Sequence, residues 1–103
     1  MQLRFTKRAR TEFLRIVDVY AEYAGQRSAD KFIDKMRKCG ESILKYPTAS
    51  HPEMLLEGRK RLYRSKTLTE NYRVIYHVTG TSVWIDDIWD GRRNPARLVK
   101  RIK

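Results

Sequence analysis

This chain of 103 residues is short of cysteine, proline, acidic residues and long apolar runs. Its single cysteine, Cys39, excludes an internal disulfide and a cysteine-based metal cluster. No apolar stretch approaches the ~20 residues that a membrane-spanning helix needs. The opening residues, MQLRFTKRAR, lack the apolar core of about 7–15 residues that defines a signal peptide. We therefore expect a protein of a reducing, cytoplasmic compartment.

Several kinds of catalytic site are also missing. His51 and His77 have no repeating spacing and no accompanying cluster of ligands, so we expect neither a metal nor another cofactor. The chain has no G-x-S-x-G motif and no glycine-rich phosphate loop. Asp86 and Asp87 are adjacent on an expected strand, where they would point to opposite faces, so they make a poor pair of catalytic carboxylates. We expect at least one of them to pair with an arginine.

Acidic residues are outnumbered. The chain has 23 Lys and Arg against 12 Asp and Glu, which gives a formal net charge of +11. Such a charge attracts polyanions, either nucleic acid or an acidic protein segment, although it can also serve solubility alone. The hydrophobic fraction of 41% is sufficient for a packed core, and the length fits one domain spanning residues 1–103.

Periodicity predicts a small α+β domain in the order β-α-α-β-β-β, with two N-terminal helices on one face of an antiparallel sheet. A first helix begins at about Thr6 and ends at Gly25, and a second is capped by Ser28 and ends before Pro47. Asn94-Pro95 predicts a short C-terminal helix. The expected strands span residues 2–6, 63–68, 72–78 and 83–89, with a loop at 47–52.

The expected strand 72–78 separates its side chains into two sets. Alternation places apolar side chains on one face, where the two helices cover them: Tyr72, Val74, Tyr76 and Val78. Arg73 and His77 then project from the opposite face. We expect that face to be open, concave and basic.

The segment just before this strand is rich in cations, with no acid between Glu57 and Glu70. Its basic residues are Arg59, Lys60, Arg61, Arg64 and Lys66. Clustered cations lower the pKa of a lysine and stabilise a developing phosphate charge. RNA supplies its own 2′-hydroxyl nucleophile, so such a site suits RNA cleavage. The alternative is a solvated edge strand, on which Lys and Arg discourage aggregation.

The element order, the run NYRVIYHV and the ending IWDGRRNP resemble the RelE/ParE superfamily of type II toxin–antitoxin toxins. The resemblance covers nearly the whole chain. It implies a growth-inhibiting toxin that is neutralised by a cognate acidic antitoxin. A disordered acidic antitoxin segment would bind by strand addition or as an amphipathic helix.

RelE-like members of this superfamily cut messenger RNA on the ribosome without a metal. An ungapped comparison with them assigns Lys66 as the base and Arg93 as the acid or leaving-group stabiliser. Arg64 and Arg73 would be the phosphate clamps. The C-terminal tyrosine that stacks on RNA in these enzymes falls on Val99.

We expect the nucleic-acid-binding surface to extend beyond those four residues. Tyr63 or His77 would replace the missing aromatic. The full set of expected nucleic-acid-binding residues is Arg59, Lys60, Arg61, Tyr63, His77 and Arg92. ParE-like members keep the fold, lack the nuclease residues and poison DNA gyrase. The resemblance thus leaves a ribosome-dependent nuclease, the interpretation that we favour here, and a non-catalytic gyrase inhibitor, its alternative.

Overall fold

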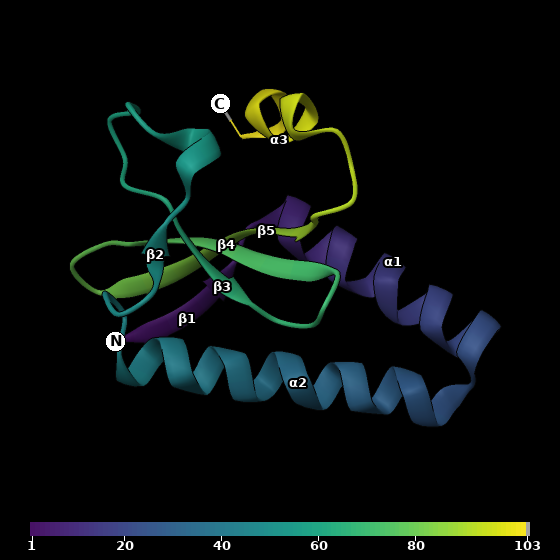
Figure 1. Cartoon of the computed structure of the whole chain (residues 1–103). Coiled ribbons are helices and arrows are strands. Elements are labelled where there is room, and N and C mark those ends of the chain that lie inside the picture. The colour runs from purple at the N-terminus through teal and green to yellow at the C-terminus, as the bar shows by residue number, and fades with distance from the viewer. Residues whose placement is uncertain (103) are drawn as a thin grey trace.

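The computed structural model describes residues 1–102, which form an α+β domain with a five-stranded sheet (Figure 1). The helices are α1 (Lys7–Ala24), α2 (Gln26–Lys45), the 3-10 helix η1 (Met54–Leu56) and α3 (Pro95–Arg101). The strands are β1 (Gln2–Phe5), β2 (His51–Pro52), β3 (Arg64–Thr67), β4 (Tyr72–Val78) and β5 (Ser82–Asp90). The predicted order is confirmed, while β2 is an addition within the segment predicted as loop and η1 lies in a segment to which no element was assigned.

The strands lie in the order β1-β5-β4-β3-β2. β1 pairs in parallel with β5, and the other neighbours are antiparallel. The sheet is therefore mixed, and the predicted fully antiparallel sheet is wrong at this one edge. α1 and α2 lie within the long connection that leads from β1 to its parallel partner β5.

Residues at the helix ends explain where the helices begin. The Thr6 side chain accepts a hydrogen bond from the N–H of Ala9 at 3.1 Å, as an N-cap does. The Asn94 side chain accepts from the N–H of Ala96 at 3.0 Å, ahead of Pro95 at the first helical position. Gly25, with a φ of 90°, separates α1 from α2, so α2 begins before the expected cap at Ser28.

α1 and α2 pack on one face of the sheet and enclose the larger apolar cluster (Figure 1). Its fully buried members include Ile16, Val74, Tyr76, Val83 and Ile85. The expected inner face of β4 is confirmed. On the helices, Leu14 of α1 is 54% exposed and Ile33 of α2 is 41% exposed, so these two apolar side chains lie outside the core. Gly40 lets α2 approach β1, because a Cβ there would lie 2.7 Å from Leu3 Cδ2.

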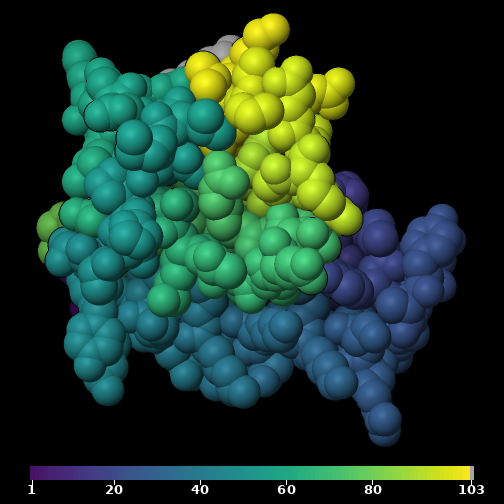
Figure 2. Space-filling view, in the orientation of Figure 1, coloured from purple at the N-terminus to yellow at the C-terminus, as the bar shows by residue number. Residues whose placement is uncertain are grey.

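The other face of the sheet carries a second, smaller cluster. η1 and α3 lie over this face, and their apolar side chains pack with those of β4, β5 and the segment before β3. The buried members of this cluster are Leu56, Tyr63, Ile75, Trp89, Leu98 and Ile102. Figure 2 shows α3, in yellow, against the teal segment that contains η1. The expectation of an open sheet face is therefore wrong. No helix within residues 1–102 is long and apolar enough to span a membrane.

Candidate functional site

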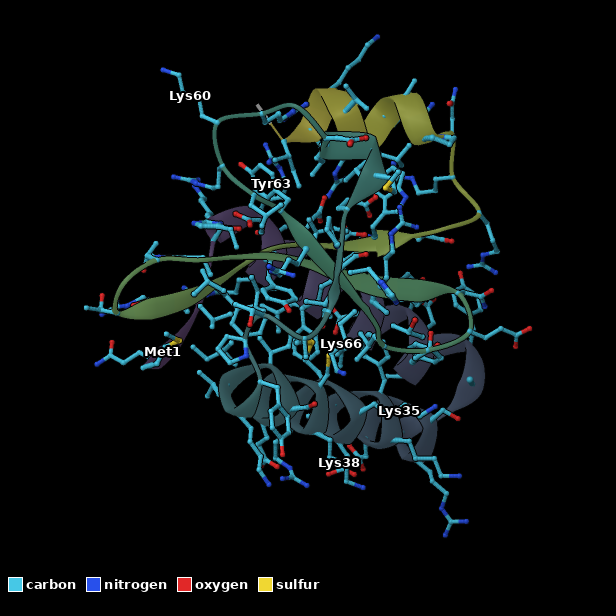
Figure 3. All side chains as sticks on the ribbon, turned by 60° about the vertical axis from the view of Figure 1, so that its left-hand side comes forward. Met1, Lys35, Lys38, Lys60, Tyr63 and Lys66 are labelled. Atoms are coloured by element: carbon cyan, nitrogen blue, oxygen red, sulfur yellow. The ribbon has the colours of Figure 1, made fainter. Side chains whose placement is uncertain are left out.

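Arg64 and Lys66 lie on the face of the sheet that α1 and α2 cover. In the antiparallel register, Arg64 is opposite Tyr76 and Lys66 is opposite Val74. Directly opposed residues point to the same face, and both partners belong to the cluster beneath α1 and α2. Lys66 lies between the sheet and α2 (Figure 3), and Arg64 donates to the Ser50 carbonyl at 2.7 Å.

Arg73 and Arg93 lie on the opposite face. Arg73 is opposite Trp89 in the sheet, and the Arg93 guanidinium lies 5.2 Å from the Trp89 ring. Arg73 is not free, since its Nε donates to the buried Glu53 carboxylate at 2.6 Å. The sheet thus separates the four residues of the expected nuclease set into two pairs, and their predicted convergence on one face is wrong.

Tyr63 and His77 are buried, each with 5% of its surface exposed. The two rings meet edge to face with centroids 5.8 Å apart. His77 Nδ1 lies 2.7 Å from an Asp86 carboxylate oxygen. Tyr63 belongs to the second, smaller cluster and His77 is buried against it, so neither ring can stack on a nucleic-acid base in this conformation.

The segment between η1 and β3 keeps part of its predicted basic surface. Lys60 and Arg61 are exposed and form no ion pair within residues 1–102. Arg59 instead donates to the Val99 carbonyl of α3 at 2.7 Å. Arg92 pairs with Asp90 at 2.9 Å, and this contact lowers the pKa of Asp90. Lys60, Arg61 and Arg92 are therefore the exposed members of the expected nucleic-acid-binding set, and Lys60 and Arg61 are those without an ion pair within residues 1–102.

Asp86 and Asp87 share one face, contrary to expectation. The register of β4 and β5 shifts between Ile75 and Tyr76, so Asp86 is an extra residue in β5. Such a β-bulge turns two successive side chains toward the same side. Asp86 contacts His77, and Asp87 receives two hydrogen bonds from Arg101 of α3 at 2.8 and 2.9 Å. The expected pairing of one of them with an arginine is confirmed.

Burial dominates the electrostatics of both carboxylates. Desolvation raises the pKa of Asp86 above its usual value, and its hydrogen bond to His77 opposes that rise. Desolvation likewise raises the pKa of Asp87, against the guanidinium of Arg101. The Asp86–His77 and Asp87–Arg101 pairs adjoin the second, smaller cluster, and both carboxylates are buried. They therefore suit a structural role.

Two further features bear on chemistry. Burial raises the pKa of the Cys39 thiol to about 11, and the charge of Lys66 opposes that rise. The thiol is therefore protonated and unsuited to nucleophilic attack, as expected for a core cysteine. Within residues 1–102, no three His, Cys, Asp or Glu side chains are grouped in a way that could hold a metal ion.

Comparison with known proteins assigns the family. The sequence model described as "ParE toxin of type II toxin-antitoxin system, parDE" matches residues 3–95. The chain belongs to the ParE toxin family. It is thus a toxin of a toxin–antitoxin system, within the RelE/ParE superfamily that its sequence resembles, and this family implies an antitoxin as its partner. No curated protein sequence matches it significantly.

Solved structures support the fold of this ParE-family toxin. A chain of the "Chromosomal ParDE TA system from P. aeruginosa" superposes with a TM-score of 0.70 at 19% identity, covering 87% of this chain and 95% of that one. The "YoeB/ParE toxin from Agrobacterium tumefaciens" gives 0.63 at 20% identity, covering 87% and 98%. At these identities the likeness shows the fold alone.

Proposed function

We propose that this ParE-family toxin arrests growth by binding and inhibiting DNA gyrase, without cleaving RNA. The observation that carries the proposal is the separation of the expected nuclease residues. Lys66 shares the α2-facing side with Val74, whereas Arg93 lies beside Trp89 on the other side. Membership in the ParE family agrees with it.

The geometry matters because proton transfer is short-range. A base and an acid that act on one phosphodiester must both lie within hydrogen-bond reach of it. The sheet stands between Lys66 and Arg93, and the Nε of Arg73 is occupied by Glu53. Val99, at the position of the stacking aromatic of RelE-like enzymes, offers no ring. A function that depends on surface binding does not need these groups to converge.

A RelE-like endoribonuclease is the second candidate. The spacing of Arg64, Lys66, Arg73 and Arg93 in the sequence favours it, because it follows the nuclease pattern without a gap. Its targets would be the ribosome and messenger RNA. This activity requires a rearrangement that brings residues from both faces of the sheet into contact with one substrate.

Timed induction in cells distinguishes the two candidates. We expect the wild-type toxin to reduce plasmid supercoiling before protein synthesis falls, and purified gyrase to lose supercoiling activity when the toxin is added. Lys66→Ala and Arg93→Ala should each retain growth arrest. An early stop of translation with cleaved mRNA would refute the proposal. So would a loss of roughly 10²-fold in mRNA cleavage by either variant, the scale of general acid–base catalysis.

The cognate antitoxin would neutralise the toxin by covering its binding surface. Lys60 and Arg61 are exposed and unpaired within residues 1–102, which suits an acidic antitoxin segment. Binding between the two proteins should weaken at high salt, since exposed charges are screened.

A further inference from the structure

A pocket of about 190 Å³ opens where α1, α2 and the β3–β4 turn meet. Six residues line it: Tyr20, Ser28, Lys31, Phe32, Lys35 and Thr69. It lies away from the segment 59–63 and from α3, so it is separate from the surface that we assign to the antitoxin. No carboxylate lines it within residues 1–102.

The two lysines of the pocket have no anionic partner in the described chain. The ion pairs along α2 use other residues, with Asp34 held by Arg37 and Lys38 and Glu41 held by Arg37. Lys31 and Lys35 are one turn apart on the same side of α2, a spacing at which like charges repel. Figure 3 shows Lys35 on this helix. An anion between the two ammonium groups would remove that repulsion.

Hydroxyl groups complete a lining of hydrogen-bond donors. The Thr69 hydroxyl already accepts from the N–H groups of Asn71 and Tyr72, at 3.3 and 3.2 Å, so its proton is left to donate. Tyr20 and Ser28 add two more hydroxyls. The Tyr20 ring stacks on buried Phe32 with centroids 5.1 Å apart, which fixes one wall.

From these observations we propose that the pocket binds a phosphate group. The pocket offers two ammonium groups and three hydroxyls as hydrogen-bond donors. A planar carboxylate has only two oxygens to accept from them. A tetrahedral phosphate presents three or four oxygens, and it can contact donors from three elements at once. The phosphate is either free or part of a phosphodiester chain, and binding at this site requires no contact with gyrase.

An NMR titration of the isotope-labelled toxin tests the proposal, with the protein made by cell-free synthesis. Inorganic phosphate, a short oligothymidylate and acetate are added separately at constant ionic strength. We expect saturable shifts of the Ser28 and Thr69 amide signals with phosphate and none with acetate. A tighter response to the oligonucleotide would assign the phosphate to a nucleic-acid backbone. An equal response to acetate, or no saturation with phosphate, would overturn the proposal.

A matched pair of double variants separates the pocket from general charge attraction. Lys31→Gln/Lys35→Gln should weaken phosphate binding at least about tenfold, because both charge-assisted contacts are lost. The control Lys7→Gln/Arg8→Gln removes the same net charge from exposed residues of α1 and should leave affinity within about twofold. Equal losses in the two variants would refute a defined site. Amide spectra that match the wild type away from the substitutions establish that each variant is folded.

Discussion

The two faces of the sheet are stabilised by different physical means. Beneath α1 and α2 the contacts are almost wholly apolar, and Ile85 and Val83 have no measurable exposure. Beneath η1 and α3 a smaller apolar cluster is bordered by buried ionisable groups, among them Glu53, Asp87 and His77. Truncating a buried apolar side chain lowers the free energy of unfolding in proportion to the apolar area that is lost. Removing the partner of a buried charge lowers it further, because the remaining charge is desolvated and unpaired. The stability of the face beneath α1 and α2 should therefore depend most on side-chain volume. The stability of the face beneath η1 and α3 should depend most on the pairing of its buried charges.

The largest expected effect is on the face that α1 and α2 cover. Ile85→Ala should lower the free energy of unfolding by roughly 2–5 kcal/mol, because it leaves a cavity in a close-packed cluster. Urea denaturation measures the change. The control Leu14→Ala, at a residue that is 54% exposed, should stay within about 0.5 kcal/mol. Similar losses for both variants would mean that this face is not close-packed.

The next effect concerns the pair that attaches α3. Arg101→Met leaves the fully buried Asp87 without the two hydrogen bonds from Arg101, so that within residues 1–102 only the Ile88 N–H still donates to it. We expect a loss of roughly 2 kcal/mol, less than the 3–5 kcal/mol of a rigidly buried pair, because α3 can detach locally. Hydrogen exchange should accelerate in α3 and remain slow in β4.

A second substitution checks the cause of that loss. Asp87→Asn/Arg101→Met removes the charge as well as its partner, and it should recover much of the stability lost by Arg101→Met alone. Equal stabilities for the single and double variants would show that packing by the Arg101 side chain, and not the charge of Asp87, holds α3.

The smallest effect is chemical and lies between the helices and the sheet. The pKa of Cys39 rises from 9.0 to about 11 on folding. At pH 8 the folded protein should therefore hold about 100-fold less thiolate than the unfolded chain, and alkylation by iodoacetamide should slow at least as much. Because the unfolded thiol ionises first, folding stability should decline as the pH rises from about 9 to about 11. Equal alkylation rates with and without urea would contradict this assignment.

Much of the fold was predictable because the signals are local. Thr6 and Asn94 cap their helices as expected, and the alternation in β4 places Val74 and Tyr76 toward the helices. The parallel partner of β1 was not predictable, since strand order depends on contacts between distant segments. The cover formed by η1 and α3 was missed for the same reason. Single residues such as Trp89 gave no sign of what packs on them.

The candidate site was predicted less well, because its geometry depends on register. The ungapped comparison with the RelE-like pattern put Lys66 and Arg73 in one site, yet the β3–β4 register pairs Lys66 with Val74 and Thr67 with Arg73. A shift of one residue would have reversed the faces. The bulge at Asp86 likewise has no signature in the sequence. Glu53, which binds Arg73, lies 20 positions earlier in the chain, just beyond the loop expected at residues 47–52.

The parallel pairing of β1 with β5 has a consequence for synthesis. Gln2 pairs with Ser82 and Phe5 with Ile85, so β1 cannot pair until β5, the last of the five strands in chain order, has been synthesised. Contacts between such distant segments form late, since the intervening loop must close first. An interrupted translation product would lack the strand that lies between β1 and β4. The sheet can therefore be completed only after β5 has been synthesised, and until then β1 lacks its only neighbour in the sheet of residues 1–102.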